Sequence, residues 1–318
     1  MRAVNCVLVT GAAGFAGGHL LEHLTGRCEL VAWARSDPPA ELATLATWRR
    51  VDLFDRDSVR REIRDLRPAA IYHCAGAPHV GQSWHNAVEP LAGNVLTTHY
   101  LLDSVRRAEI ACRMLITGSA TVYAPSSAPL REDDPLAPAS PYGLSKLAQE
   151  QLGARAATED GVDVVLTRPF NHIGPRQRPA FAASGIARQI AVIERGGIDP
   201  VIKVGNLDAK RDLTDVRDTV RAYHLLMGRG TPGVVYNVAS GVARVIREVL
   251  DALVRRSSVR IQISVDPERL RPQDTPVLVG DASRLRAATG WAPAIAFDET
   301  LDDLLEYWRR TVRDEPAR

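Results

Sequence analysis

The stretch TGAAGFAGGHL (residues 10–20) follows the apolar run NCVLVT (5–10) and leads into the helical pattern HLLEHL. Its glycines Gly11, Gly14 and Gly17 have the spacing GxxGxxG. Glycines in such a turn let backbone N–H groups approach a pyrophosphate at the N-terminus of the following helix. Because the motif lies between a strand pattern and a helix pattern, it predicts a dinucleotide-binding turn.

Strand and helix patterns alternate along the chain beyond this turn. Apolar segments typical of strands and amphipathic segments typical of helices follow one another, the strands at 28–34, 69–76, 112–120 and 162–171 and the helices at 58–67, 89–108 and from 142 onward. Such alternation predicts an α/β fold with a doubly wound parallel sheet of the Rossmann type. The strands are almost continuously apolar, which fits a sheet covered on both faces. After Pro169 the pattern loosens, so we expect a smaller C-terminal lobe beside the strand ends.

Bulk composition excludes several classes of protein. The chain has 318 residues, 25% of them charged, and a net charge of +2, so no nucleic-acid or anionic-membrane partner is expected. No apolar run approaches the roughly 18 residues of a membrane span, and the N-terminus leaves no room for a signal peptide. The four cysteines stand singly in apolar segments without a CxxC pair. This usage is typical of reduced cysteines, so we expect a cytoplasmic protein.

The end of the second strand pattern bears on the choice of dinucleotide. An acidic residue there binds the ribose 2′-hydroxyl of NAD, whereas an arginine accepts the 2′-phosphate of NADP. This chain reads Trp33-Ala34-Arg35-Ser36, which favours NADP(H). Alternatively, Arg35 is a surface residue and Asp37 binds the ribose 2′-hydroxyl, in which case the cofactor is NAD(H). Asp52 and Leu53, at a further strand end, are candidates to flank the adenine, or form a plain loop.

A second stretch, SPYGLSK (140–146), places Tyr142 and Lys146 four residues apart on one helix face. A cation beside a phenol favours the phenolate, so we expect Lys146 to lower the pKa of Tyr142 and make it a useful proton donor. In the alternative, Tyr142 packs at a helix start and Lys146 is a solvated charge. Ser119 ends the preceding strand pattern, where it can hydrogen-bond a substrate oxygen. Ser119, Tyr142 and Lys146 are therefore the candidate catalytic set.

With these residues in place the chain resembles the extended short-chain dehydrogenases/reductases that modify nucleotide sugars. The resemblance covers nearly the whole length and rests, in order, on TGAAGFAGGHL, VDL, SATVY, SPYGLSK, RPFN, RDLTDV and the RPQD loop. It implies an NADP(H)-binding Rossmann domain at 1–168, with 212–240 returning to it. It also implies a lobe that binds the nucleotide sugar, formed by 169–211 and 241–318.

The resemblance also implies roles for further residues. Lys146 would hold the nicotinamide ribose, and Phe15 and Ala75 would join the cofactor contacts of Gly11, Gly14, Gly17, Arg35, Ser36, Asp52, Leu53 and Tyr142. The substrate contacts would come from Thr121, Asn171, Arg211, Arg271 and Asp274, with the arginines on the phosphates, where their forked geometry suits bidentate binding. Without the resemblance, each arginine is more simply interpreted as a surface residue that forms an ion pair with a nearby acidic side chain.

Two positions narrow the reaction. Sugar-nucleotide 4,6-dehydratases carry an Asp-Glu pair just after the serine or threonine, where this chain has Ala120 and Thr121, so we reject a dehydratase. The segments 168–177, 204–218 and 269–291 resemble the GDP-6-deoxy-D-mannose reductases. The expected reaction is therefore NADPH-dependent reduction of the C4 keto group of a 4-keto-6-deoxyhexose nucleotide, GDP-4-keto-6-deoxy-D-mannose to GDP-D-rhamnose. The alternatives are a UDP-sugar 4-epimerase with tightly bound NAD and a non-catalytic dinucleotide sensor.

The sequence also bears on metal binding and on assembly. HLLEH (19–23) matches the inverted zinc-protease pattern HxxEH, but no convincing third ligand accompanies it, so we expect no metal. Family analogy suggests a homodimer in which the helices 89–108 and 142–156 pair into a bundle.

Overall fold

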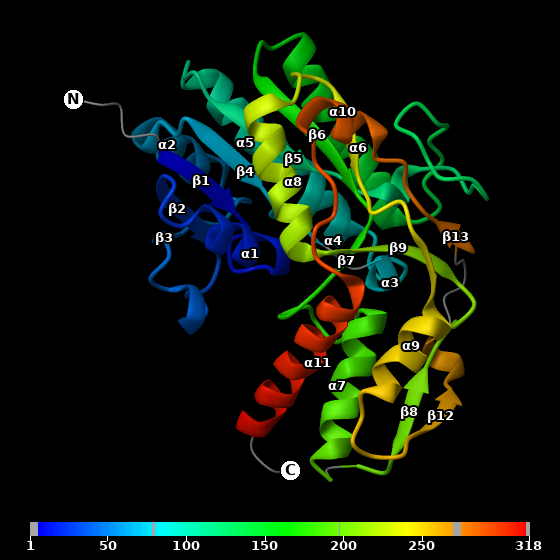
Figure 1. Cartoon of the computed structure of the whole chain (residues 1–318). Helices are drawn as coiled ribbons and strands as arrows, with labels where there is room; N and C mark the ends of the chain where they lie inside the picture. The colour runs from blue at the N-terminus through cyan, green and yellow to red at the C-terminus, as the bar shows by residue number, and fades with distance from the viewer. Residues whose placement is uncertain (1–5, 78–79, 197, 270–274, 316–318) are drawn as a thin grey trace.

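The central element is a sheet of seven parallel strands in the order β10-β6-β5-β4-β1-β2-β3 (Figure 1). The computed structural model describes residues 6–77, 80–196, 198–269 and 275–315. This is the Rossmann-type arrangement, and it confirms the α/β, doubly wound prediction. The strands of this sheet are β1 (Cys6–Thr10), β2 (Glu29–Ala34), β3 (Thr47–Arg50), β4 (Ala70–His73), β5 (Arg113–Thr117), β6 (Asp163–Pro169) and β10 (Val235–Val238).

Two layers of helices cover the sheet. α1 (Phe15–Leu24), α8 (Val216–Arg229) and α10 (Ser283–Thr289) pack together on one face, and α2 (Arg56–Leu66), α5 (Thr97–Arg107) and α6 (Pro141–Thr158) pack on the other. An apolar core lies on each face of the sheet. Alternate residues of a strand belong to the two cores in turn, because successive side chains of a strand point to opposite faces. Val7 and Val9 join the first core, and Cys6 and Leu8 join the second.

Short turns and helical pieces complete this part of the chain. They are η1 (Ala40–Leu42), α3 (Val80–Ser83), α4 (Val88–Pro90), the π-helical turn η2 (Leu91–Leu96) and η3 (Ala120–Val122). The expected helical pattern at 89–108 is confirmed, because α4, η2 and α5 follow one another without a break from Val88 to Arg107. The π-turn within it was not predicted, because a single wider turn alters the apolar periodicity only slightly.

A third apolar core lies below the central sheet in Figure 1 and is built by a separate group of elements. Its helices are α7 (Ala182–Glu194), α9 (Ile246–Arg255) and α11 (Phe297–Asp314). Small sheets flank them, formed by β7 (Asn171–Ile173), β8 (Val201–Val204), β9 (Lys210–Asp215), β11 (Ala243–Val245), β12 (Gln262–Val265) and β13 (Val277–Leu278), with η4 (Pro267–Arg269) as a connector.

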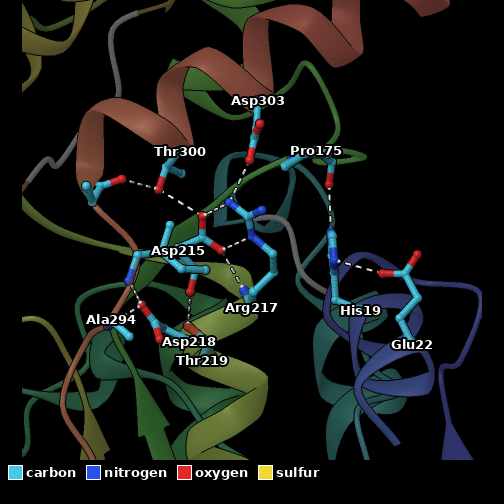
Figure 2. A network of polar contacts seen from close by, with 12 residues as sticks. His19, Glu22, Pro175, Asp215, Arg217, Asp218, Thr219, Ala294, Thr300 and Asp303 are labelled. Carbon is cyan, nitrogen blue, oxygen red and sulfur yellow. Dashed lines mark hydrogen bonds and ion pairs between the residues drawn. The ribbon is translucent and has the colours of Figure 1, made fainter. Parts of the chain in front are cut away.

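Three buried aspartates at the junction of β9 and α8 join these parts. Figure 2 shows two of them, Asp215 and Asp218. Asp215 accepts hydrogen bonds from Arg217 and from the Thr300 hydroxyl on α11. Asp218 accepts the backbone N–H groups of residues 294 and 295, each at 2.9 Å. Asp212 accepts from the backbone N–H groups of residues 240, 241 and 280. Charge-assisted hydrogen bonds of this kind are the stronger ones, so they fix the C-terminal segments against the sheet.

The turn after β1 requires glycine for two separate steric reasons. Gly11 has a φ of +66°, and a Cβ there would lie 2.6 Å from the backbone nitrogen of Ala75. At Gly17 a Cβ would lie 2.3 Å from the carbonyl oxygen of Gly11. The first contact brings the end of β1 against the segment after β4, and the second brings α1 against the turn.

Within the described residues, no helix is both long enough and apolar enough to cross a bilayer.

Replacing Gly17 with alanine is expected to destabilise the fold by about 1–3 kcal/mol, because the methyl group would overlap a backbone carbonyl that cannot move without displacing the turn. Gly228, on α8, is the matched control because its Cβ position has no atom within 4 Å. Gly228→Ala should be neutral or stabilising by up to about 1 kcal/mol. Denaturant unfolding measures both variants, and equal free energies of unfolding for the two would contradict the steric account.

Candidate active site

The carboxyl ends of β1 and β4 form the topological switch point of the sheet. From β1 the chain continues to β2 and β3 on one side, and β4 then starts the other side of the sheet. Ligands of open α/β sheets bind at such a point. The glycine turn lies there: Gly14 is the residue before α1, and its N–H donates to the Gly11 carbonyl at 2.9 Å. This close-packed glycine turn, in which Cβ atoms at Gly11 and Gly17 would overlap backbone atoms, fits a dinucleotide.

Two local caps position the candidate catalytic residues at the same edge. Ser119 follows β5 and caps η3, and its Oγ accepts the N–H of Thr121 at 3.2 Å. Ser140 caps α6 by accepting the N–H of Gly143 at 3.0 Å, with Pro141 at the first helical position. Serine before proline is a strong helix start. It sets Tyr142 in the first turn of α6, with its phenol close to the Ser119 hydroxyl.

The expected net lowering of the Tyr142 pKa is wrong in this structure. Burial raises the pKa of Tyr142 to about 12, and the hydrogen bond with Ser119 offsets only part of that rise. The side chain is 9% exposed, so desolvation of the phenolate dominates. Tyr142 therefore holds its proton throughout the neutral range, which is the state that a proton donor needs.

Lys146 is buried rather than solvated, so the surface-charge alternative is excluded. It is 6% exposed, and its Nζ donates to the Thr117 carbonyl and to Gln149 Oε1, each at 2.7 Å. Burial lowers the pKa of Lys146 to about 8, while the nearby Cys74 acts in the opposite direction. Because this pKa lies close to neutral, a small change in the surroundings of Lys146 is enough to protonate or deprotonate its side chain near neutral pH.

The residues expected to bind the cofactor lie around the switch point and the outer strands. Phe15 begins α1 and stacks on His172, with ring centroids 5.5 Å apart. Ala75 follows β4, next to Gly11. Arg35 and Ser36 are exposed just after β2, and Asp52 and Leu53 follow β3, the former exposed and the latter buried. Their cofactor contacts stay predictions.

The expected substrate residues fall into two groups. Thr121 lies with the catalytic set, since its hydroxyl is 2.9 Å from Ser119 Oγ. Asn171 is exposed at the start of β7, which pairs with β9, and Arg211 on β9 donates to the carbonyl of Thr275 at 2.7 Å. Arg271 and Asp274 lie outside the described residues.

The sequence reading missed Asn94, which is fully buried in the π-turn η2. Its Oδ1 accepts the N–H of Ala77 after β4, and its Nδ2 donates to Ser145 Oγ at 2.9 Å. Asn94 therefore links the end of β4 to α6, between Tyr142 and Lys146. The available signal was an asparagine inside an apolar helical pattern, since π-turns often mark functional sites.

The histidines of the HLLEH segment are held by other partners. His19 has both ring nitrogens engaged, one with the Pro175 carbonyl at 2.9 Å and one with Glu22 at 3.2 Å (Figure 2). His23 instead packs edge-on against His224 of α8. A search of the described parts of the chain finds no group of three or more His, Cys, Asp or Glu residues that could hold a metal ion.

A Rossmann-type sheet with a glycine cradle at its switch point and Ser119, Tyr142 and Lys146 at the same edge defines an NAD(P)-dependent oxidoreductase of the extended short-chain dehydrogenase/reductase type. Residues 8–304 match the family model described as GDP-mannose 4,6 dehydratase, and the chain belongs to this family.

Relatives with assigned activities align over nearly the full length. The chain is 34% identical to GDP-6-deoxy-D-mannose reductase of Pseudomonas aeruginosa, over 97% of this chain and 99% of the relative. It is 31% identical to UDP-glucose 4-epimerase of Azospirillum brasilense, over 90% and 87%. Among solved structures, RMD from Pseudomonas aeruginosa complexed with NADPH superposes with a TM-score of 0.85 at 32% identity, over 96% of this chain and 99% of that one.

Turnover is expected to fall as the pH rises through about 8, because Lys146 then loses its proton, while Tyr142, with a pKa near 12, keeps its own. A pH profile of kcat/KM from 6 to about 10 measures this alkaline limb. Lys146→Arg stays protonated over that range. It should turn over more slowly and lack the limb near 8; an unchanged limb would assign the titration to another group.

Proposed function

We propose that the protein reduces the C4 keto group of a 4-keto-6-deoxyhexose nucleotide with NADPH, converting GDP-4-keto-6-deoxy-D-mannose to GDP-D-rhamnose. The observation that carries the proposal is a protonated Tyr142 in contact with Ser119, without a carboxylate at position 120 or 121. The alignment with GDP-6-deoxy-D-mannose reductase over nearly the whole chain supports the same substrate class.

The carboxylates near the site support reduction rather than elimination of water. Elimination needs an acid and a base, and positions 120 and 121 supply alanine and threonine. Glu150 is the carboxylate beside Gly118, just before Ser119. It is buried and accepts two hydrogen bonds from Arg168, at 2.8 and 2.7 Å. Both of its oxygens are thus occupied by one guanidinium, so Glu150 is a structural partner of Arg168 rather than a general acid.

The chain's own groups account for the proton in this reaction. Bound NADPH supplies the hydride that the carbonyl carbon receives. The Ser119 hydroxyl donates a hydrogen bond to the carbonyl oxygen and orients it beside Tyr142. Tyr142 then donates its proton to the oxygen as negative charge develops there, and the buried ammonium of Lys146 stabilises the phenolate that forms.

The cofactor and the sugar nucleotide are assigned to different parts of the chain. We place NADP(H) on residues 1–168 and 212–240, with the 2′-phosphate at Arg35 and Ser36, and the nucleotide sugar on 169–211 and 241–318, against Thr121, Asn171 and Arg211. The separate apolar core of α7, α9 and α11 supports this division. One segment of the second part, α10, packs against α8 and β10 and so returns to the first.

The test is oxidation of NADPH, followed optically, with GDP-4-keto-6-deoxymannose made in place by a separate dehydratase. Substrate-dependent loss of NADPH with a GDP-deoxyhexose product is expected, and NADH should be oxidised more slowly. Tyr142→Phe should lower turnover by about 10²–10⁴-fold and leave NADPH affinity unchanged, because it removes only the proton donor. Tyr307→Phe on α11 is the matched control and should match the wild type.

A second outcome would favour the epimerase. If NADPH is not consumed, and the denatured protein releases NAD, the chain acts through both half-reactions with a retained cofactor. The 31% identity to a UDP-glucose 4-epimerase makes this the relevant alternative. Full activity of Tyr142→Phe in either assay would contradict the assigned role of the phenol.

The chain is further proposed to act as a homodimer in the cytoplasm. Large apolar side chains are exposed on neighbouring elements α4, η2 and α6, namely Val88, Leu91, Leu96 and Leu144. Such a patch on a soluble domain is typical of an interface, and a second copy with the same helices would cover it. The four cysteines are all free thiols, which supports a reducing compartment.

Leu144→Glu is expected to shift the protein from dimer to monomer, because it places a charge in the centre of this apolar patch, where the leucine is 52% exposed. Val265→Glu, on the exposed strand β12, introduces the same charge elsewhere and should leave the dimer intact. Size-exclusion chromatography with light scattering distinguishes the two. Identical masses for both variants would rule out this interface.

A further inference from the structure

Lys146 belongs to a buried hydrogen-bond network that reaches from α6 to the glycine turn. Its Nζ donates to Gln149 Oε1 at 2.7 Å, and Gln149 is completely buried. In the described part of the chain no carboxylate forms an ion pair with Lys146. The acceptors of the buried ammonium are therefore neutral oxygens, one from the Thr117 backbone and one from the Gln149 side chain.

The contacts of the neighbouring side chains fix the orientation of the Gln149 amide. Gln149 Nε2 donates to Thr98 Oγ1 at 2.8 Å, and Thr98 uses its own proton to donate to the Asn94 carbonyl at 2.6 Å. A reversed amide would direct its NH₂ group at the ammonium and its oxygen at a hydroxyl whose proton is already used. Both new contacts would be repulsive, so the amide has one acceptable orientation.

The same reasoning extends the network to β4 and β1. His73 Nε2 lies 2.9 Å from Thr98 Oγ1, and because that hydroxyl donates elsewhere, Nε2 must carry the proton. His73 Nδ1 then accepts from the Thr10 hydroxyl at 2.7 Å. Thr10 is the residue before Gly11. Each donor group from Thr10 to Gln149 thus has one acceptor, and the series connects the glycine turn to the ammonium.

We propose that Gln149 is a positioning residue that holds the Lys146 ammonium in its protonated state and in place at the active-site edge, with Thr98 and His73 fixing the direction of its amide. This inference rests on the proposed function, in which Lys146 contacts the nicotinamide ribose and stabilises the Tyr142 phenolate. Gln149 touches neither group in this assignment; it acts through Lys146.

The other groups that face Lys146 cannot replace this acceptor. The end of β4 places His73 and Cys74 near Lys146, β5 presents a backbone carbonyl, and Tyr142 lies one turn earlier on α6. The Thr98 hydroxyl of α5 contacts Gln149. Burial lowers the pKa of His73 to about 3 and raises the pKa of Cys74 to about 12. With Tyr142 also protonated, these titratable groups are uncharged near pH 8. Loss of the Gln149 oxygen therefore acts directly on the ammonium.

The test is the pH dependence of Gln149→Met, which keeps the length of the side chain and removes the acceptor. A hydrogen bond to a charged group corresponds to a pKa change of about one unit or more. The alkaline limb of kcat/KM should therefore move from about 8 to lower pH by about one unit. Gln151→Met, at an exposed position of the same helix, is the control and should keep the wild-type limb.

Fluorescence titration with NADPH, repeated across the same pH range, gives a readout that needs no sugar substrate. The loss of NADPH affinity at alkaline pH should move in the same direction as the kinetic limb. If the chain fails to reduce the keto sugar but this shift appears, the proposed substrate is wrong and the role of Gln149 stands. If Gln149→Met folds and both limbs stay at the wild-type pH, Gln149 has only a packing role.

Gln149→Glu tests the same idea in the opposite direction and serves if the methionine variant does not fold. A carboxylate beside the ammonium favours the charged form, so the alkaline limb should move above 8. An alkaline limb that stays at the wild-type pH in Gln149→Glu would overturn the proposal.

Discussion

A positive charge that is buried without a carboxylate partner among the described residues is the constraint around which the active-site edge is organised. Removing an ammonium from water costs several kcal/mol unless the protein supplies other oxygens. Here the oxygens come from the end of β5 and from a side chain on the same helix as Lys146. Because those oxygens must stay in place, the elements that carry them are joined by further hydrogen bonds, and strands β1, β4 and β5 and helices α5 and α6 become one rigid unit.

Two adjacent residues of α6 bind two different cations. Gln149 offers a neutral oxygen to Lys146, and Glu150 offers its carboxylate to Arg168, whose guanidinium also lies over the Tyr123 ring. If the carboxylate faced Lys146 instead, the cation would be paired and its pKa raised. The observed arrangement leaves the ammonium unneutralised beside a protonated phenol. A phenolate that forms during proton transfer then finds a positive charge not already committed to another anion.

The general fold could be predicted from the sequence because its strands are apolar, its helices amphipathic and its glycine turn distinctive. The strands that the sequence patterns did not predict are short or polar. Strand β3 reads TWRR and lies at the edge of the sheet, where a strand needs few apolar residues. Strand β9 reads KRDLTD, and its buried aspartates accept hydrogen bonds rather than face water. Pattern alone cannot show which polar groups are buried with partners.

The same limit explains the outcome for the candidate site. The sequence brought Ser119, Tyr142 and Lys146 into one hypothesis, and the structure places them at one edge. The direction of the Tyr142 pKa could not be predicted from the four-residue spacing, because spacing gives proximity while the pKa depends on burial. His73, Thr98 and Gln149 lie far apart along the chain and have no motif. Their relation depends on the packing of β4, α5 and α6 and is visible only in three dimensions.

The three aspartates of the β9–α8 junction also determine how the molecule can move. Separating the C-terminal elements from the sheet would strip Asp212, Asp215 and Asp218 of donors from residues 240, 280, 294 and 300, among others. Each buried carboxylate left without its hydrogen-bond donors would cost about 1–3 kcal/mol or more of folding free energy. Opening the molecule between its two cores would therefore carry a large energetic cost. The hydrogen bonds of the junction set the placement of the C-terminal core against the sheet without any contribution from a ligand.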